Sequence, residues 1–244
     1  MPFKHGSKTS VYLGGLDLSP YLNAAEWSSD LDTGETTTFN STFKTYIAGT
    51  FGSKATFGGY YDPTMTDLEA TLGVDYSLTS GVLTICAGGG TIADDARLLS
   101  IATSNYTQTS PVGGVVGVKW DAQTSAPVGF GHVLHPMGAD TNTTTGAERD
   151  DAAATSLGWI AHLHVTGITG GGSWVVKLQD AAVTNTYSDL TGGAFTTTAV
   201  KSSQRLVSAT NTTALRRYVR YVATRTGGAG GDTVSFQLSY SRNS

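Results

Sequence analysis

The stretch Asp32-Thr-Gly-Glu-Thr-Thr-Thr-Phe39 opens a region in which threonines and aromatic residues recur. Phe43-Lys-Thr-Tyr-Ile47 follows it, and after Gly49 the same pattern returns in Ala55-Thr-Phe-Gly-Gly-Tyr-Tyr-Asp62. β-Branched and aromatic residues suit a pleated surface, and the glycines between them mark turns. The pattern predicts two or three adjacent β-strands with no catalytic residue among them.

The composition extends this prediction to the whole chain. The 244 residues include 31 glycines and 38 threonines, 39% are apolar and only 14% are charged. Such a mixture favours many short strands, and we predict an all-β protein with one short helix over 63–72. The predicted strands lie near 8–13, 23–30, 36–48, 54–61, 79–86, 97–107, 114–122, 128–135, 157–166, 174–179, 186–190, 194–200, 205–209, 215–224 and 233–240.

Residues 138–155 are rich in turn residues and lack a period-2 pattern, which is typical of a linker. We therefore expect an N-terminal β domain over 1–137, a linker over 138–155 and a C-terminal β-sandwich over 156–244. Strict alternation supports the sandwich, as in Trp174, Val176 and Leu178.

Residues 33–53 have too little apolar mass to build a core. We expect Thr33–Phe51 to form an extended arm, here called the arm. The backbone groups at an open strand edge promote association unless a partner covers them.

The formal net charge of −4 is unevenly divided. Residues 1–137 hold six basic and twelve acidic residues, and residues 138–244 hold nine basic and seven acidic ones. Neither half has the clustered cations that bind phosphates tightly. The chain lacks a signal-peptide pattern and an apolar run of 18 residues, so we expect synthesis in the cytosol and no membrane partner.

The residues that could carry chemistry have simpler structural explanations. His162 and His164 share one face of a strand, but a zinc site needs a third ligand. The acidic groups Asp30/Asp32/Glu35 and Asp94/Asp95 match no calcium-loop pattern. Cys86 is alone and sits in an apolar run, which favours a small buried hydrophobe. We expect neither catalysis nor a metal or other cofactor.

Arginines concentrate in one segment of the second half, where Arg216 and Arg220 flank Tyr218. Interleaved arginine and tyrosine side chains can contact nucleic acid or a glycan. A solvated outer face with subunit salt bridges explains them more simply, and these three residues are the candidates for outer-surface contacts.

Three motifs carry a resemblance to a known family: the acidic-Thr-Thr-Phe entry, the Lys-Thr-Tyr-Ile-x-Gly arm and the Gly-Tyr-Tyr-Asp exit. Together they resemble the N-terminal half of the major tail tube proteins of long-tailed, non-contractile bacteriophages (siphophages). Trp159–Val165, with three later segments, resembles the sandwich domain appended to some of these proteins.

The resemblance implies a structural protein of the virion tail, made in the host bacterial cytoplasm. In that family, six subunits form a ring with one inner β-barrel, the rings stack, and an extended loop contacts the next ring. The partners would be copies of the chain, other tail proteins, and viral DNA that passes without specific binding. The implied contact residues in the arm are Thr36, Thr37, Thr38, Phe39, Phe43, Lys44, Tyr46 and Ile47. An acidic, Thr-rich face of 1–137 would line the channel, and the C-terminal sandwich would project outward.

Two other functions remain open at this point. A capsid decoration or cement protein would share the Thr/Gly-rich β composition. A carbohydrate-binding module of a tail fibre would use aromatic side chains, for which Trp159, Trp174, Tyr187 and Tyr221 are the candidates.

Overall fold

The structure, a computed structural model, describes residues 6–62, 81–228 and 230–243. Within these residues the chain consists of antiparallel β-strands, with one 3-10 turn, η1, at Gly6–Lys8. The prediction of an all-β fold is confirmed, and the helix predicted over 63–72 lies outside the described residues. The chain forms two compact units. Unit 1 comprises Met1–Pro20, Gly81–Ser100 and Pro127–Ser244, and unit 2 comprises Tyr21–Ser80 and Ile101–Ala126.

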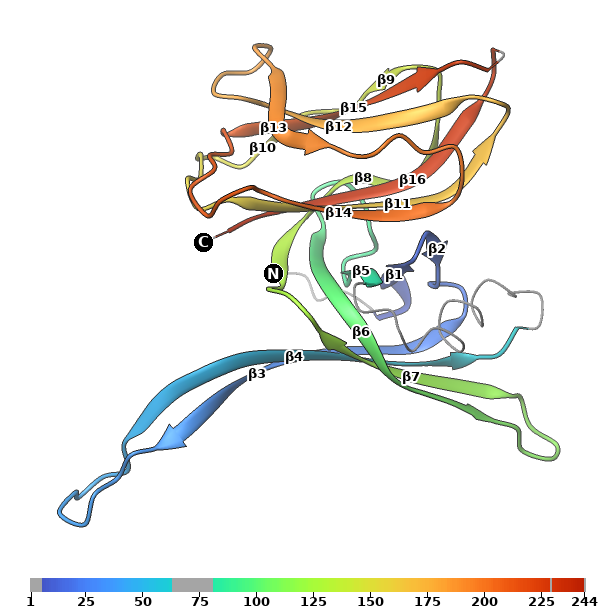
Figure 1. Ribbon diagram of the computed structural model, residues 1–244. Coiled ribbons are helices and arrows are strands. Elements are labelled where there is room, and N and C mark those ends of the chain that lie inside the picture. The colour runs from blue at the N-terminus through green and yellow to red at the C-terminus, as the bar shows by residue number, and fades with distance from the viewer. Residues whose placement is uncertain (1–5, 63–80, 229, 244) are drawn as a thin grey trace. The chain divides into compact units, whose positions relative to one another are not determined.

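Unit 1 contains two sheets packed face to face (Figure 1). One has the strand order β14-β11-β16-β8, and the other has the order β10-β15-β12-β13 with β9 beside β15. The bounds are β8 Gly129–Thr141, β9 Thr144–Thr145, β10 Arg149–Asp150, β11 Trp159–Thr169, β12 Ser173–Ala181, β13 Ser188–Ala194, β14 Ser202–Val207, β15 Tyr218–Thr226 and β16 Thr233–Arg242.

Period-2 alternation fills the core between these sheets. On β16, Val234, Phe236 and Leu238 are fully buried, and on β12 Trp174 and Val176 face them from the other sheet. Burying one such side chain contributes about 1.5–3 kcal/mol. The predicted C-terminal sandwich is therefore confirmed as an architecture.

A second, smaller core lies in the part of unit 1 formed by the earlier strands. β1 Ser10–Leu13, β2 Leu16–Asp17, β5 Gly81–Cys86 and β6 Asp95–Thr109 continue the first sheet beyond β8 in the order β6-β5-β1-β2. Tyr12, Cys86 and Leu98 pack there with Ile160 of β11. Burial raises the pKa of the Cys86 thiol to about 12, so this residue is the buried hydrophobe that the sequence predicts.

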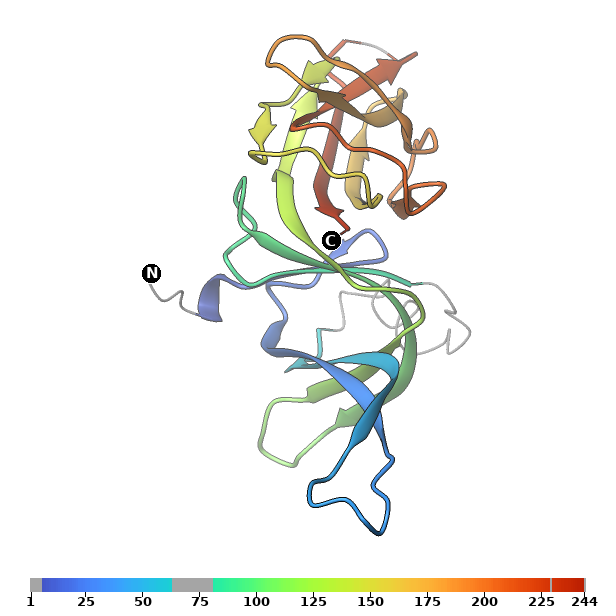
Figure 2. The same ribbon diagram turned by 90° about the vertical axis from the view of Figure 1, so that its left-hand side faces the viewer.

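Unit 2 is a four-stranded antiparallel sheet with the order β3-β4-β7-β6, formed by β3 Leu22–Glu35, β4 Tyr46–Tyr60, β7 Gly117–Thr124 and residues 101–109 of β6. The rings of Phe57 and Trp120 stack with centroids 4.1 Å apart, and both side chains are buried. β7 pairs with β4 only from Lys54 to Tyr60. Beyond Lys54, β3 and β4 form a two-stranded ribbon (Figures 1 and 2).

The boundary predicted at 138–155 falls inside unit 1. Residues 138–141 complete β8, because Thr141 pairs with Thr233 of β16. Residues 144–145 and 149–150 are β9 and β10, which both pair with β15. The segments 1–20 and 81–100 also belong to unit 1. Strands far away in the sequence therefore hold the turn-rich residues 138–150 in place, and these residues do not form a linker.

Candidate functional site

The arm is the outer part of the β3–β4 ribbon. The two strands stay paired as far as Glu35 and Tyr46, and Thr36 N donates to Thr45 O at 2.8 Å. The strand predicted over 36–48 begins only at Tyr46, so the prediction is wrong for residues 36–45. Thr37 Oγ1 accepts a hydrogen bond from Thr45 N at 3.1 Å, and such side-chain bonds to the backbone compete with a strand ladder. These residues form the ribbon tip instead.

The arm carries large apolar side chains with no cover. Phe39, Phe43, Tyr46, Ile47 and Phe51 are between 54% and 115% exposed. The polar candidates bond locally: Lys44 pairs with Glu35 at 3.1 Å, and Thr38 Oγ1 lies 3.1 Å from Ser41 Oγ. The predicted arm is thus an exposed β-ribbon, and the contact role assigned to its residues stays a prediction.

The exposed apolar face of the ribbon continues the buried face of unit 2. Phe51 lies opposite Leu31, and alternation along β4 places Phe51 on the same face as Ala55 and Phe57, which are buried. An extra residue in β4 breaks the register just beyond Phe51. A Cβ on Gly49 would lie 2.9 Å from the Asp32 carbonyl oxygen, so glycine is required at this bulge.

The opposite face of the unit 2 sheet is polar. Asp121 of β7 accepts hydrogen bonds from Thr56 at 2.7 Å and from Asn105 at 3.2 Å. The Thr56 hydrogen bond, with smaller contributions from Asn105, Lys119 and Lys54, lowers the pKa of Asp121. By sequence, unit 2 holds three lysines against nine acidic residues, so the acidity expected of 1–137 is concentrated in this unit.

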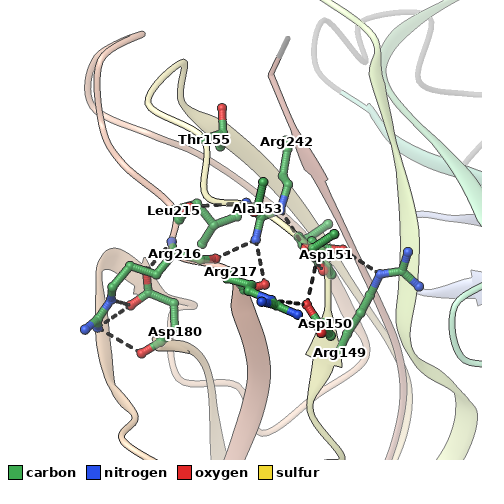
Figure 3. Close-up of polar contacts among 12 residues, drawn as sticks. Arg149, Asp150, Asp151, Ala153, Thr155, Asp180, Leu215, Arg216, Arg217 and Arg242 are labelled. Carbon is green, nitrogen blue, oxygen red and sulfur yellow. Dashed lines mark hydrogen bonds and ion pairs between the residues drawn. The ribbon is translucent and has the colours of Figure 1, made fainter. Parts of the chain in front are cut away.

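The arginines predicted as outer contacts are engaged within unit 1. Arg216 donates from Nε and Nη2 to Asp180 Oδ1, at 3.0 and 2.6 Å (Figure 3). It also donates a hydrogen bond to Ser188. Arg220 donates to Gln179 Oε1 at 2.9 Å and lies 3.8 Å from the ring centroid of Tyr187. Arg216 is therefore held by a salt bridge, and Arg220 is held by a hydrogen bond and a cation–π contact.

Tyr218 is half-buried, and its ring stacks on a neighbouring arginine. The guanidinium of Arg217 lies 4.9 Å from the Tyr218 ring centroid. Arg217 also forms a two-bond ion pair with Asp150, which lowers the pKa of Asp150 to about 2. Arg216 and Arg217 directly precede β15, and Figure 3 shows both ion pairs.

A second cluster centres on Asp151, which follows β10. Its carboxylate accepts hydrogen bonds from Arg149 Nε at 2.7 Å and from Arg242 Nε at 2.6 Å (Figure 3). It also accepts one from Tyr240 Oη at 2.5 Å. Burial and the Asp151 charge raise the pKa of Tyr240 far above its ordinary value, so its hydroxyl stays protonated and donates. Sequence reasoning missed this cluster, because Asp151 and Arg242 are far apart in the chain.

His162 and His164 are fully buried against Thr84 of β5. Arg205 Nη1 lies 3.0 Å from His162 Nε2, and a guanidinium can only donate. His162 therefore presents Nδ1–H to Thr84 Oγ1, at 3.1 Å, and the Thr84 hydroxyl donates to His164 Nε2 at 2.8 Å. This chain of hydrogen bonds favours the structural role predicted for the two histidines.

The other candidates do not form a metal site in the described ranges. No three His, Cys, Asp or Glu side chains there could hold a metal ion together. Trp159 and Trp174 are buried core residues, so they offer no face to a sugar. Tyr187 bonds Glu148, and Tyr221 Oη donates to Asp140 at 3.0 Å. The carbohydrate site predicted from these four aromatic residues is wrong.

No helix in the described part of the chain has the length and hydropathy needed to cross a membrane.

Comparisons with known proteins give weak structural likenesses. No protein-family profile matches the sequence, and no curated protein sequence does. A chain from the virion of a native gene transfer agent particle is 12% identical with a TM-score of 0.43, over 52% of this chain and 98% of that chain. The Dit protein of phage SPP1, a hub of the adsorption apparatus in phages infecting Gram-positive bacteria, is 13% identical with a TM-score of 0.35, over 94% and 98%.

A third likeness is the tube-terminating cap of the anti-feeding prophage, which is 12% identical with a TM-score of 0.40, over 53% of this chain and 93% of that chain. At such identities and scores, these likenesses do not establish a shared function.

Proposed function

We propose that this chain is a structural protein of a bacteriophage tail, and that it assembles with copies of itself through the arm. The observation that carries the proposal is the uncovered apolar surface of the β3–β4 ribbon. Large contiguous apolar surface on a folded protein marks an interaction site. The sequence motifs that resemble siphophage tail tube proteins lie in the same residues.

The backbone of the ribbon supports the same conclusion. Among the described residues, β3 pairs only with β4, and β4 pairs with β7 only from Lys54 onward. Both edges of the outer ribbon therefore have free backbone donors and acceptors. A two-stranded hairpin is marginally stable alone in water, and an open edge promotes strand addition. A second copy of the chain would satisfy these groups.

The finer form of the proposal is a tail tube of stacked hexameric rings. In it, the four-stranded sheets of unit 2 from six subunits join in one barrel, which removes the open edges. The polar face that carries Thr56 and Asp121 lines the channel. With three lysines against nine acidic residues, unit 2 has too few cations to bind passing DNA tightly. Unit 1 then lies outside the channel wall.

The test compares the wild-type chain with two double variants. Phe43→Ser/Phe51→Ser removes two exposed aromatic residues of the ribbon, and Val183→Ser/Val200→Ser removes two exposed apolar residues of unit 1 as the matched control. We expect rings or tubes in negative-stain images of the wild type and the control. The arm variant stays monomeric by light scattering with an unchanged melting temperature, because the substituted side chains make no buried contact.

Three results would overturn the proposal. The wild type could remain monomeric at high concentration, or the arm variant could assemble as the wild type does. Trimers or single copies that bind a capsid shell would identify a decoration protein instead.

A further inference from the structure

Unit 1 contains a pocket that the proposed tail function does not use. Its volume is about 370 Å³, and it lies beside the Asp151 cluster. Phe130 and His132 of β8 line it from the larger sheet. Arg149 and Asp150 of β10 line it from the other sheet. Pockets of this size hold small ligands of roughly one sugar unit or slightly more.

The pocket wall is held rigid by the Asp151 cluster. Asp151 is nearly buried, and its carboxylate fixes Arg149, Tyr240 and Arg242 at the same time. Asp150 is likewise held by Arg217. Because the two acidic groups are already paired with cations, they repel an entering anion weakly. A preformed wall also lowers the entropy cost of binding.

Arg149 supplies hydrogen-bond donors that the protein does not use. Its side chain is 18% exposed, and its Nε donates to Asp151. Among the described residues, neither terminal nitrogen of its guanidinium has an acceptor, and Figure 3 shows these nitrogens pointing away from Asp151. A planar pair of N–H donors matches the two oxygens of a carboxylate or phosphate.

Phe130 supplies an apolar surface on the same pocket. Its side chain is 55% exposed, and the guanidinium of Arg97 lies 5.0 Å from its ring centroid. An exposed aromatic ring offers a flat face to the C–H groups of a sugar ring.

We propose that this pocket binds one anionic sugar unit, with the carboxylate or phosphate of the sugar on Arg149 and the sugar ring against Phe130. The site is separate from the arm, and its residues differ from the aromatic residues that the sequence singled out. It therefore stands whether or not the chain forms a tube.

Isothermal titration calorimetry on the full chain tests the proposal with four probes: glucuronate, glucose 6-phosphate, glucose and inorganic phosphate. We expect both anionic sugars to bind more tightly than glucose and than phosphate. Arg149→Gln weakens this binding by about tenfold or more, because it removes the charged fork. Arg220→Gln, which removes a cation from another part of unit 1, is the matched control and leaves binding unchanged.

Phe130→Ala keeps the test decisive if Arg149→Gln destabilises the fold, because no hydrogen bond of the Asp151 cluster involves Phe130. We expect this variant to lose sugar binding while its melting temperature stays near that of the wild type. If glucose bound as tightly as glucuronate, the role of Arg149 would be refuted. If inorganic phosphate bound as tightly as glucose 6-phosphate, the role of Phe130 would be refuted. Absence of binding by all four probes at 10 mM, roughly the weak end of small-ligand affinity, would overturn the proposal.

Discussion

Acid should destabilise unit 1, because His162 and His164 are buried as neutral imidazoles. Burial lowers the pKa of both, to about 3 for His164, and the Arg205 charge lowers that of His162 further. In the unfolded chain each would titrate near 6.5. Below that pH the unfolded state binds more protons than the folded state, so the free energy of unfolding falls as the pH falls.

The magnitude follows from the ordinary histidine pKa of about 6.5, because both side chains stay neutral in the folded state. Each histidine that stays neutral in the folded state lowers the free energy of unfolding by about 1.4 kcal/mol for each pH unit below 6.5. At pH 5 this amounts to about 2 kcal/mol for each histidine and about 4 kcal/mol for the pair. Domains are typically stable by about 5–15 kcal/mol, so the loss is a large part of the total.

Urea unfolding at pH 7.5, 6.0 and 5.0, followed by tryptophan fluorescence and circular dichroism, measures the effect. The control is His162→Gln/His164→Gln, which keeps polar side chains but removes the titrating groups. We expect this variant to be less stable at pH 7.5 and to lose most of the slope between pH 6.5 and 5. An unfolding free energy that is equal at pH 7.5 and 5.0 in the wild type, or a variant with the wild-type slope, would refute the reasoning.

Three further predictions concern the packing of single residues. Gly131→Ala should prevent stable folding of unit 1, because a Cβ there would lie 1.9 Å from the Tyr240 carbonyl oxygen. Gly167→Ala is the control, because a Cβ there would meet nothing within 4 Å, and thermal melts compare the two variants. Phe57→Ala should cost about 3–5 kcal/mol by loss of its packing on a buried indole, measured by urea unfolding of unit 2. Asp151→Asn should cost about 3–5 kcal/mol, because it leaves two mostly buried guanidinium groups without their anion; a melting temperature equal to that of the wild type would contradict this.

The strands could be predicted from the sequence where one face is buried. Val234, Phe236 and Leu238 alternate with polar residues, and all three are buried as expected. The strand predicted over 36–48 failed at its start, because threonine side chains bond the backbone at the tip. There the residue types favour a strand, but no neighbouring strand continues the ladder.

The division into units and much of the polar structure could not be predicted, because both depend on long-range pairing. Residues 138–155 have the composition of a linker, yet β15 and β16 pair with them. Thr84 contacts His162 and His164 from 78 and 80 residues away. The exposure of the arm was predictable, since a lack of apolar mass is a local property.

The place of β16 in its sheet determines the order in which the chain can fold during synthesis. β16 lies between β11 and β8, so these two strands have no partner between them until residues 233–242 have left the ribosome. All residues of unit 2 have been made by Ala126. Domains fold as units while synthesis proceeds. A nascent chain can therefore present a finished ribbon to its neighbours on a polysome while more than half of unit 1 is still to be translated.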